Sequence, residues 1–284
     1  MIPAAFDYVR ASSLSEAISL LHDDPDGTKL LAGGHTLLPA LKLRLASPNR
    51  LVDIGGIPEL RGIEISGKGI RIGALTTHAE LLASELLNSE LPIFREAARV
   101  IADPQVRNRG TIGGSLANAD PAADWPAIVI ALQAEIEIAG PSDTRRVAAK
   151  DFFVDIFTTV LEQDEVLAAI HIPKPDPGMR FTYRKIRHPA SGFAVVGIAA
   201  GVHLQDGVVA AISVGITGAA NNAFACQATA DFLTGKTLSR ENIDEAAKLA
   251  GETTECLSDH YASAEYRVNL IRTEMRRALL ALAS

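Results

Sequence analysis

The stretch KLLAGGHTLLP, at residues 29–39, joins a short apolar run to a helical one through a pair of glycines. The apolar run at 29–32 predicts a buried strand, and the spacing of apolar residues at 36–45 predicts a helix. Glycine lacks a Cβ and tolerates positive φ angles, so backbone N–H groups at Gly33 and Gly34 can converge on an anion. The positive end of the helix dipole favours the same ligand. The stretch therefore indicates a phosphate-binding turn, although a plain strand-to-helix turn has the same sequence features.

A second glycine-bearing segment, RGTIGGSLANADPAAD at residues 109–124, is rich in small residues and carries little charge. Loops exposed to water usually carry more charge. This composition therefore indicates either close approach of the backbone to a ligand or tight packing of backbone on backbone. Neither segment contains the G-K-[ST] of a Walker A loop or the G-x-G-x-x-G of a Rossmann fold. Two such segments in one chain, without a catalytic triad or a metal-binding set, favour a phosphate-bearing cofactor.

The composition indicates a globular chain of about two domains. Of the 284 residues, 48% are hydrophobic and 21% are charged, which is too apolar for a disordered chain. The formal net charge of -7 argues against a nucleic-acid-binding protein, which normally presents a basic face. Cys226 and Cys256 form no C-x-x-C motif, so the chain alone cannot hold a four-cysteine iron–sulfur or zinc site. No signal peptide and no apolar run of about 20 residues is visible, which predicts a cytoplasmic protein.

Turn signals divide the sequence into three parts. Alternating helix and strand signals end at the glycine pair Gly55 and Gly56. The sequence PKPDPG at 173–178 is the clearest linker, because it holds three prolines and a glycine in six residues. Beyond it, Asp206 and Gly207 between two apolar runs predict a β-hairpin followed by helices, which is typical of a small α+β domain. The predicted units are residues 1–56, 57–175 and 176–284.

The chain contains AGGHTLLP at 32–39, DPQVRNRGTIGGS at 103–115 and ADPAAD at 119–124, in this order. These motifs resemble the FAD-binding (medium) subunits of the molybdenum hydroxylase family, especially those of the aerobic carbon monoxide dehydrogenase and xanthine dehydrogenase types. The opening MIPAAFDY and the YRKIRHP at 183–189 resemble the same subunits, so the similarity spans essentially the whole chain. It implies an α+β chain with a two-subdomain FAD-binding fold of the vanillyl-alcohol-oxidase (PCMH) type. A small C-terminal domain of the carbon monoxide dehydrogenase flavoprotein type would follow.

The resemblance also implies which residues bind FAD. The first glycine segment would wrap the diphosphate, and the second would give backbone and side-chain contacts to the phosphates and the ribitol. Asp124 would bind a hydroxyl group, Leu167 would make an apolar contact, and Lys185 would favour the reduced anionic flavin by charge attraction. The implied cofactor-binding residues are Lys29, Leu30, Leu31, Ala32, Gly33, Gly34, His35, Thr36, Leu37, Ile101, Thr111, Gly113, Gly114, Ser115, Asn118, Asp124, Leu167 and Lys185. No catalytic residue and no metal ligand is expected in this chain.

The resemblance further implies electron transfer within an oxidoreductase complex. A small partner subunit with two [2Fe–2S] clusters would pass electrons to FAD on this chain, and FAD would pass them to an external acceptor. A large partner subunit with a molybdenum-pterin cofactor would oxidise the substrate. We expect a cytoplasmic dimer of heterotrimers, a heterohexamer that could attach peripherally to the inner face of the membrane, without nucleic acid and without a transmembrane segment.

Two other functions are compatible with the same residues. One is a self-contained FAD-dependent oxidase or dehydrogenase of the same fold, which would need its own substrate pocket and catalytic residues. The other is a flavin-free nucleotide-binding or scaffold subunit. A visible spectrum of the purified chain separates the second alternative from both flavoprotein hypotheses.

Overall fold

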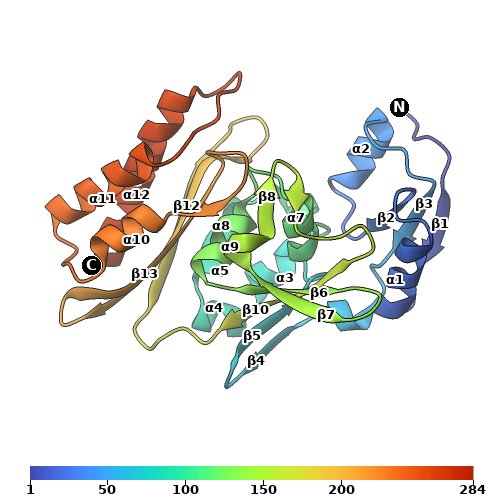
Figure 1. Ribbon diagram of the computed structural model, residues 1–284, viewed down its shortest axis with the longest axis horizontal. Helices are drawn as coiled ribbons and strands as arrows, with labels where there is room; N and C mark the ends of the chain where they lie inside the picture. Colours follow the sequence, from blue (N-terminus) through green and yellow to red (C-terminus); the bar gives the residue numbers. More distant parts are fainter. Residues whose placement is uncertain (284) are drawn as a thin grey trace.

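The computed structural model describes residues 1–283, which form three units that lie in a row (Figure 1). The first unit, at one end of the row, contains a parallel sheet in which the strand order is β1-β3-β2. Its elements are β1 (Asp7–Arg10), α1 (Leu14–Asp23), β2 (Thr28–Leu31), α2 (Leu37–Leu43) and β3 (Arg50–Asp53). The predicted helix at 36–45 therefore exists as the shorter α2, and the predicted strand at 29–32 as β2. The loop between them, residues 32–36, carries the first pair of glycines.

The second unit occupies the middle of the row and is built on an antiparallel sheet of order β4-β5-β10-β6-β7. Its first elements are η1 (Pro58–Leu60), β4 (Ile63–Ser66), β5 (Gly69–Gly73), α3 (His78–Ala83), α4 (Glu85–Glu90), α5 (Ile93–Val100), α6 (Pro104–Arg107) and α7 (Ile112–Asn118). The remaining elements are α8 (Asp124–Ala131), β6 (Glu135–Ala139), β7 (Thr144–Ala148), α9 (Ala149–Phe152), β8 (Phe153–Asp155), β9 (Thr158–Thr159) and β10 (Val166–Pro173).

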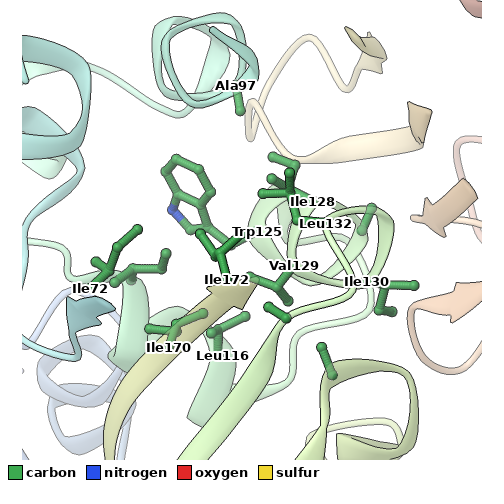
Figure 2. Close-up of a cluster of buried hydrophobic side chains, with 14 of the residues drawn as sticks. Ile72, Ala97, Leu116, Trp125, Ile128, Val129, Ile130, Leu132, Ile170 and Ile172 are labelled. Carbon is green, nitrogen blue, oxygen red and sulfur yellow. The ribbon is translucent and has the colours of Figure 1, made fainter. Parts of the chain in front are cut away.

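Helix α8 is the centre of the hydrophobic core of this unit. Every residue of the helix is buried, which explains why its sequence DWPAIVIA, apart from Asp124, is apolar on all sides rather than amphipathic. Figure 2 shows Trp125 of α8 with Ala97 of α5 on one side and the sheet residues Ile72 and Ile172 on the other. The core therefore fixes the start of α8, which lies immediately after the second glycine-bearing segment.

The third unit is an antiparallel sheet of order β11-β12-β13-β14 covered by helices (Figure 1). Its elements are β11 (Arg180–Arg187), β12 (Ala194–Gln205), β13 (Val208–Thr217), β14 (Phe224–Ala225), α10 (Gln227–Leu233), α11 (Arg240–Glu252) and α12 (Ala264–Ala283). The predicted hairpin is confirmed, because Asp206 and Gly207 join β12 to β13 with φ angles of 52° and 77°. No helix within residues 1–283 has the length and apolarity needed to cross a membrane.

Hydrogen bonds attach the sheet of the third unit to the segment that leads into α8. The hydroxyl of Thr217 donates to the carbonyl oxygens of Pro121 and Ala123 over 2.8 Å and 2.7 Å. The amide of Gly218 donates to the same Pro121 carbonyl, and the amide of Ala194 donates to the Ala122 carbonyl. The third unit therefore helps to hold residues 121–123 in one conformation, together with the bonds from the amides of Ala122 and Ala123 to Asp120.

Candidate functional site

A cleft of about 620 Å³ lies where the first and second units meet. It is lined by every residue that the family resemblance assigns to FAD, except Leu31 and Lys185. The wall also includes residues from the turn between β11 and β12, so all three units contribute to it. A second hollow of about 510 Å³, between α1 and residues 139–144, contains none of the implied residues. The larger cleft is therefore the candidate functional site.

The first glycine loop presents unused backbone donors to this cleft. Within residues 1–283, no protein group accepts a hydrogen bond from the N–H groups of residues 33–36. The loop takes its path because it packs directly on the second segment: a Cβ at Gly33 would lie 2.2 Å from the carbonyl oxygen of Arg109. Adjacent N–H groups that lack protein partners form a concave anion site.

The second glycine segment differs from the first in this respect. The amides of Ile112 and Gly113 donate to the carbonyl oxygens of Thr76 and Ala74, and those of residues 114 and 115 donate to Thr111. The resemblance implies both backbone and side-chain contacts from this segment to the phosphates and the ribitol. The amides of residues 112–115 are bonded within the protein, so the segment also offers its side chains to the cleft.

Two half-buried side chains of the second segment remain for a ligand. In the described part of the chain, neither the Ser115 hydroxyl nor the Asn118 carboxamide makes a side-chain hydrogen bond, and both residues line the cleft. A hydroxyl and a carboxamide can each donate and accept, which suits the hydroxyl groups of a sugar or ribitol chain. Thr111 is different, because its hydroxyl accepts the Gly114 amide and caps α7.

Lys185 lies one layer behind the cleft. Its side chain is only 2% exposed, and its Nζ lies 2.8 Å and 2.9 Å from the two carboxylate oxygens of Asp124. Nζ also donates to the carbonyl oxygen of Val100, while the Tyr183 hydroxyl donates to Asp124 over 2.6 Å. Burial raises the pKa of Asp124, and its bonds to Lys185 and Tyr183 oppose that shift. Asp124 lines the cleft, and Lys185, which does not, compensates the charge of the Asp124 carboxylate from the side away from the cleft.

The structure adds the pair His78 and Trp125 to the cleft, which the sequence did not predict. The indole Nε1 of Trp125 donates to Nδ1 of His78 over 3.0 Å, and only 6% of His78 is exposed. Burial lowers the pKa of His78 to about 4, and the positive charges of His35 and Arg107 add to the effect. The imidazole is therefore neutral at pH 7. Because the two residues are 47 positions apart in the sequence, no local sequence pattern predicts their contact.

Acidification is expected to destabilise the ligand-free chain through His78. Its pKa is about 4 in the folded state and 6.5 ordinarily, so between these values the unfolded chain binds more protons at this residue. The contribution, about 3 kcal/mol, is complete above pH 6.5 and is lost as the pH falls through 4. Urea unfolding at a series of pH values measures it, and His78→Gln should flatten the slope in this window. The exposed His260→Gln is the control, and equal slopes in both variants would contradict the assignment.

Two further features of the wall involve residues outside the set that the resemblance assigns to FAD. Arg107 donates to the carbonyl oxygens of Ile101 and Ala102, and so it shapes the wall rather than facing a ligand. Ser191, Gly192 and Phe193 reach the cleft from the turn between β11 and β12, and Phe193 is 44% exposed. Their approach depends on how the third unit sits against the second, which no local pattern encodes.

Comparison with known proteins places the whole chain among flavoprotein subunits. The family model described as "FAD binding domain in molybdopterin dehydrogenase" matches residues 4–175, and that of the "CO dehydrogenase flavoprotein C-terminal domain" matches residues 181–282. The carbon monoxide dehydrogenase medium chain of Afipia carboxidovorans is 39% identical over 279 residues, which cover 98% of this chain and 97% of that one. The glyceraldehyde dehydrogenase medium chain of Sulfolobus acidocaldarius is 35% identical and is covered completely, as is this chain. A chain in the crystal structure of the cyanide-inactivated Cu,Mo-CO dehydrogenase has 38% identity and a TM-score of 0.96, with coverage of 100% of this chain and 99% of that one.

Proposed function

Because this chain belongs to the family of FAD-binding medium subunits of molybdenum hydroxylases, we propose that the cleft between its first and second units holds FAD and that the chain relays electrons through it. The chain is the flavoprotein subunit of an oxidoreductase of the carbon monoxide dehydrogenase type. The observation that carries the proposed site is the run of backbone N–H groups at residues 33–36 that have no acceptor among the described residues.

The residues of the cleft fit a dinucleotide with a diphosphate in its middle. The N–H groups of residues 33–36 would bind the diphosphate, and the nearby Lys29 would add positive charge. Ser115 and Asn118 would bind the ribitol or ribose hydroxyls, to which the Asp124 carboxylate would add an acceptor. Apolar residues would contact the two ring systems, among them Leu30, Leu37, Ile101, Val106 and Leu167. Bound FAD would supply the redox chemistry, taking up electrons from a partner subunit and releasing them to an external acceptor.

The protein residues have a supporting role in this reaction. The glycine contact between Gly33 and Arg109 fixes the distance between the two walls. The pair of Asp124 and Lys185 leaves the inner wall without a net charge, because cation and anion compensate each other at 2.8 Å. The described residues contain no group of three or more His, Cys, Asp or Glu that could hold a metal ion. From the family to which the chain belongs, we assign to this chain the binding and orientation of the flavin, and to partner subunits the chemistry of the substrate.

The proposed partners are a large subunit with the molybdenum-pterin cofactor and a small subunit with [2Fe–2S] clusters. The names of the relatives support this, since both are the medium chain of a dehydrogenase. Those relatives act on different substrates, carbon monoxide and glyceraldehyde, which is expected if the medium subunit does not select the substrate. We propose a dimer of heterotrimers, and the mass of the co-expressed complex measured by light scattering tests it.

Spectroscopy and electron transfer together test the proposed function. The purified full chain, incubated with FAD and desalted, should retain one flavin per chain and show the flavin bands in its visible spectrum. In the co-expressed complex, adding substrate should bleach those bands, while the isolated chain should not be reduced by the same substrate. A chain that retains no flavin would favour the scaffold hypothesis, and a chain that oxidises substrate alone would favour a self-contained enzyme.

A further inference from the structure

We propose that His78 is a further binding residue of the cleft, whose Nε2–H donates a hydrogen bond to the diphosphate of the bound dinucleotide. This inference rests on the proposed function, because it assumes that a diphosphate lies against the first glycine loop. It adds a side chain to a site that otherwise consists of backbone N–H groups and the surface cation Lys29.

The hydrogen bond from Trp125 fixes which ring nitrogen of His78 carries the proton. An indole Nε1–H can only donate, so Nδ1 of His78 must be the acceptor. The neutral imidazole therefore carries its proton on Nε2. Trp125 is itself held in the core, where the centroid of its ring lies 5.6 Å from the centroid of the Phe94 ring. Because the buried indole N–H of Trp125 can only donate, Nε2 remains the nitrogen of His78 that carries the proton.

The backbone around His78 fixes the position of the ring. His78 is the first residue of α3, whose N-terminus is capped reciprocally by Thr77 and Glu80. The amide of His78 donates to the carbonyl oxygen of Gly110 over 3.0 Å, which ties α3 to the start of the second glycine segment. Backbone and side chain are therefore anchored at opposite ends, and the imidazole has little freedom to turn away from the cleft.

The free Nε2 lies next to the junction of the two glycine segments. A Cβ built on Gly110 would lie 2.7 Å from Nε2, and a Cβ built on Gly33 would lie 3.0 Å from the Cα of Gly110. Nε2 therefore lies beside Gly110, which packs against Gly33 of the loop that carries the unused N–H groups. No residue within 1–283 accepts a hydrogen bond from Nε2.

The donor at Nε2 keeps some accessible surface. His78 is only 6% exposed, yet its Nε2 is not one of the fully buried polar atoms that lack a partner, so a ligand in the cleft can reach it. A phosphate oxygen would satisfy the donor, and the neutral imidazole already carries its one proton on Nε2 because Nδ1 accepts from Trp125. The geometry thus matches a ligand acceptor at Nε2.

Two substitutions at this position separate the two nitrogens. In His78→Asn the side-chain oxygen takes the place of Nδ1, so the acceptor for Trp125 is retained and the donor at Nε2 is removed. In His78→Gln the amide nitrogen reaches towards the position of Nε2 and restores a donor. The exposed His260→Asn is the matched control, since it makes the same exchange away from the cleft.

Dissociation constants of the full chain for FAD, ADP and riboflavin test the proposal. In His78→Asn we expect roughly 10-fold weaker binding of FAD and ADP, which is the usual effect of losing one hydrogen bond to a charged group, and unchanged binding of riboflavin. His78→Gln should recover part of the loss. Unchanged FAD binding in His78→Asn, or an equal loss for riboflavin, would overturn the inference while leaving the proposed function intact. Failure of the wild-type chain to bind FAD would overturn both.

A measurement on the wild-type chain covers the case in which the variants fold poorly. With ¹⁵N-labelled histidine, the Nε2–H of His78 should become protected from exchange with water when FAD or ADP is added. Riboflavin, which lacks phosphate, should leave its exchange unchanged. Protection by riboflavin equal to that by FAD, or no protection by any of the three, would contradict the proposal.

Discussion

Replacing Lys185 with methionine should lower the free energy of unfolding of the chain by about 3–5 kcal/mol. The side chains of Lys185 and Asp124 are 2% and 6% exposed, so the substitution leaves a buried carboxylate without its counter-ion. The Tyr183 hydroxyl remains as a donor to Asp124, but it carries no charge to offset the carboxylate. Chemical denaturation of wild type and variant at pH 7 measures the difference.

Two controls show whether the loss comes from the unpaired charge. The double variant Lys185→Met with Asp124→Asn removes both charges and should recover a large part of the stability. Lys248→Met removes a cation that is 53% exposed and paired with Glu245 at the surface, and it should cost less than about 1 kcal/mol. A loss in Lys185→Met no larger than that of the surface control would contradict the buried ion pair.

Replacing Gly33 with alanine should weaken FAD binding by up to ~100-fold, since forcing one extra carbon into a packed site costs about 1–3 kcal/mol. The added Cβ would lie 2.2 Å from the carbonyl oxygen of Arg109, and this neighbour is backbone that cannot rotate away. The two glycine segments must separate, which displaces the N–H groups of residues 33–36. Titration of the apo chain with FAD, followed by flavin fluorescence, measures the change.

A glycine in open space provides the matched control. A Cβ at Gly67 would meet nothing within 4 Å, so Gly67→Ala should bind FAD as the wild type does. Wild-type affinity in Gly33→Ala, with an unchanged melting temperature, would show that the two segments do not meet as described. The comparison separates the effect of close packing from the general effect of adding a methyl group.

Local sequence features predicted the parts of the site that depend on local backbone geometry. The glycines at 33 and 34 stand between a strand and a helix, and the structure places them in a loop with unused N–H groups. The hairpin at Asp206 and Gly207 follows from the same kind of information, because a tight turn needs residues that tolerate positive φ. The family resemblance then connected these local features to FAD.

Long-range contacts decided the remaining features, and the sequence could not reveal them. Whether the second segment keeps free N–H groups depends on the carbonyl oxygens of Ala74 and Thr76, which come from another loop. Lys185 carries the right charge for a flavin site, but its partner Asp124 lies 61 positions away and draws it behind the wall. The tautomer of His78 depends in the same way on Trp125.

The hydrogen bonds from Thr217 and Gly218 to residues 121–123 matter for anyone who recombines such chains. Together with the Asp124–Lys185 ion pair, these bonds connect residues that precede the proline-rich linker in the sequence with residues that follow it. They join the C-terminal sheet to the inner wall of the cleft. The linker is thus a poor place to join parts of two relatives, even though its sequence is typical of a domain boundary. A chimaera would have to exchange the 121–124 segment together with the C-terminal sheet, because the hydrogen bonds and the ion pair between them require residues from both.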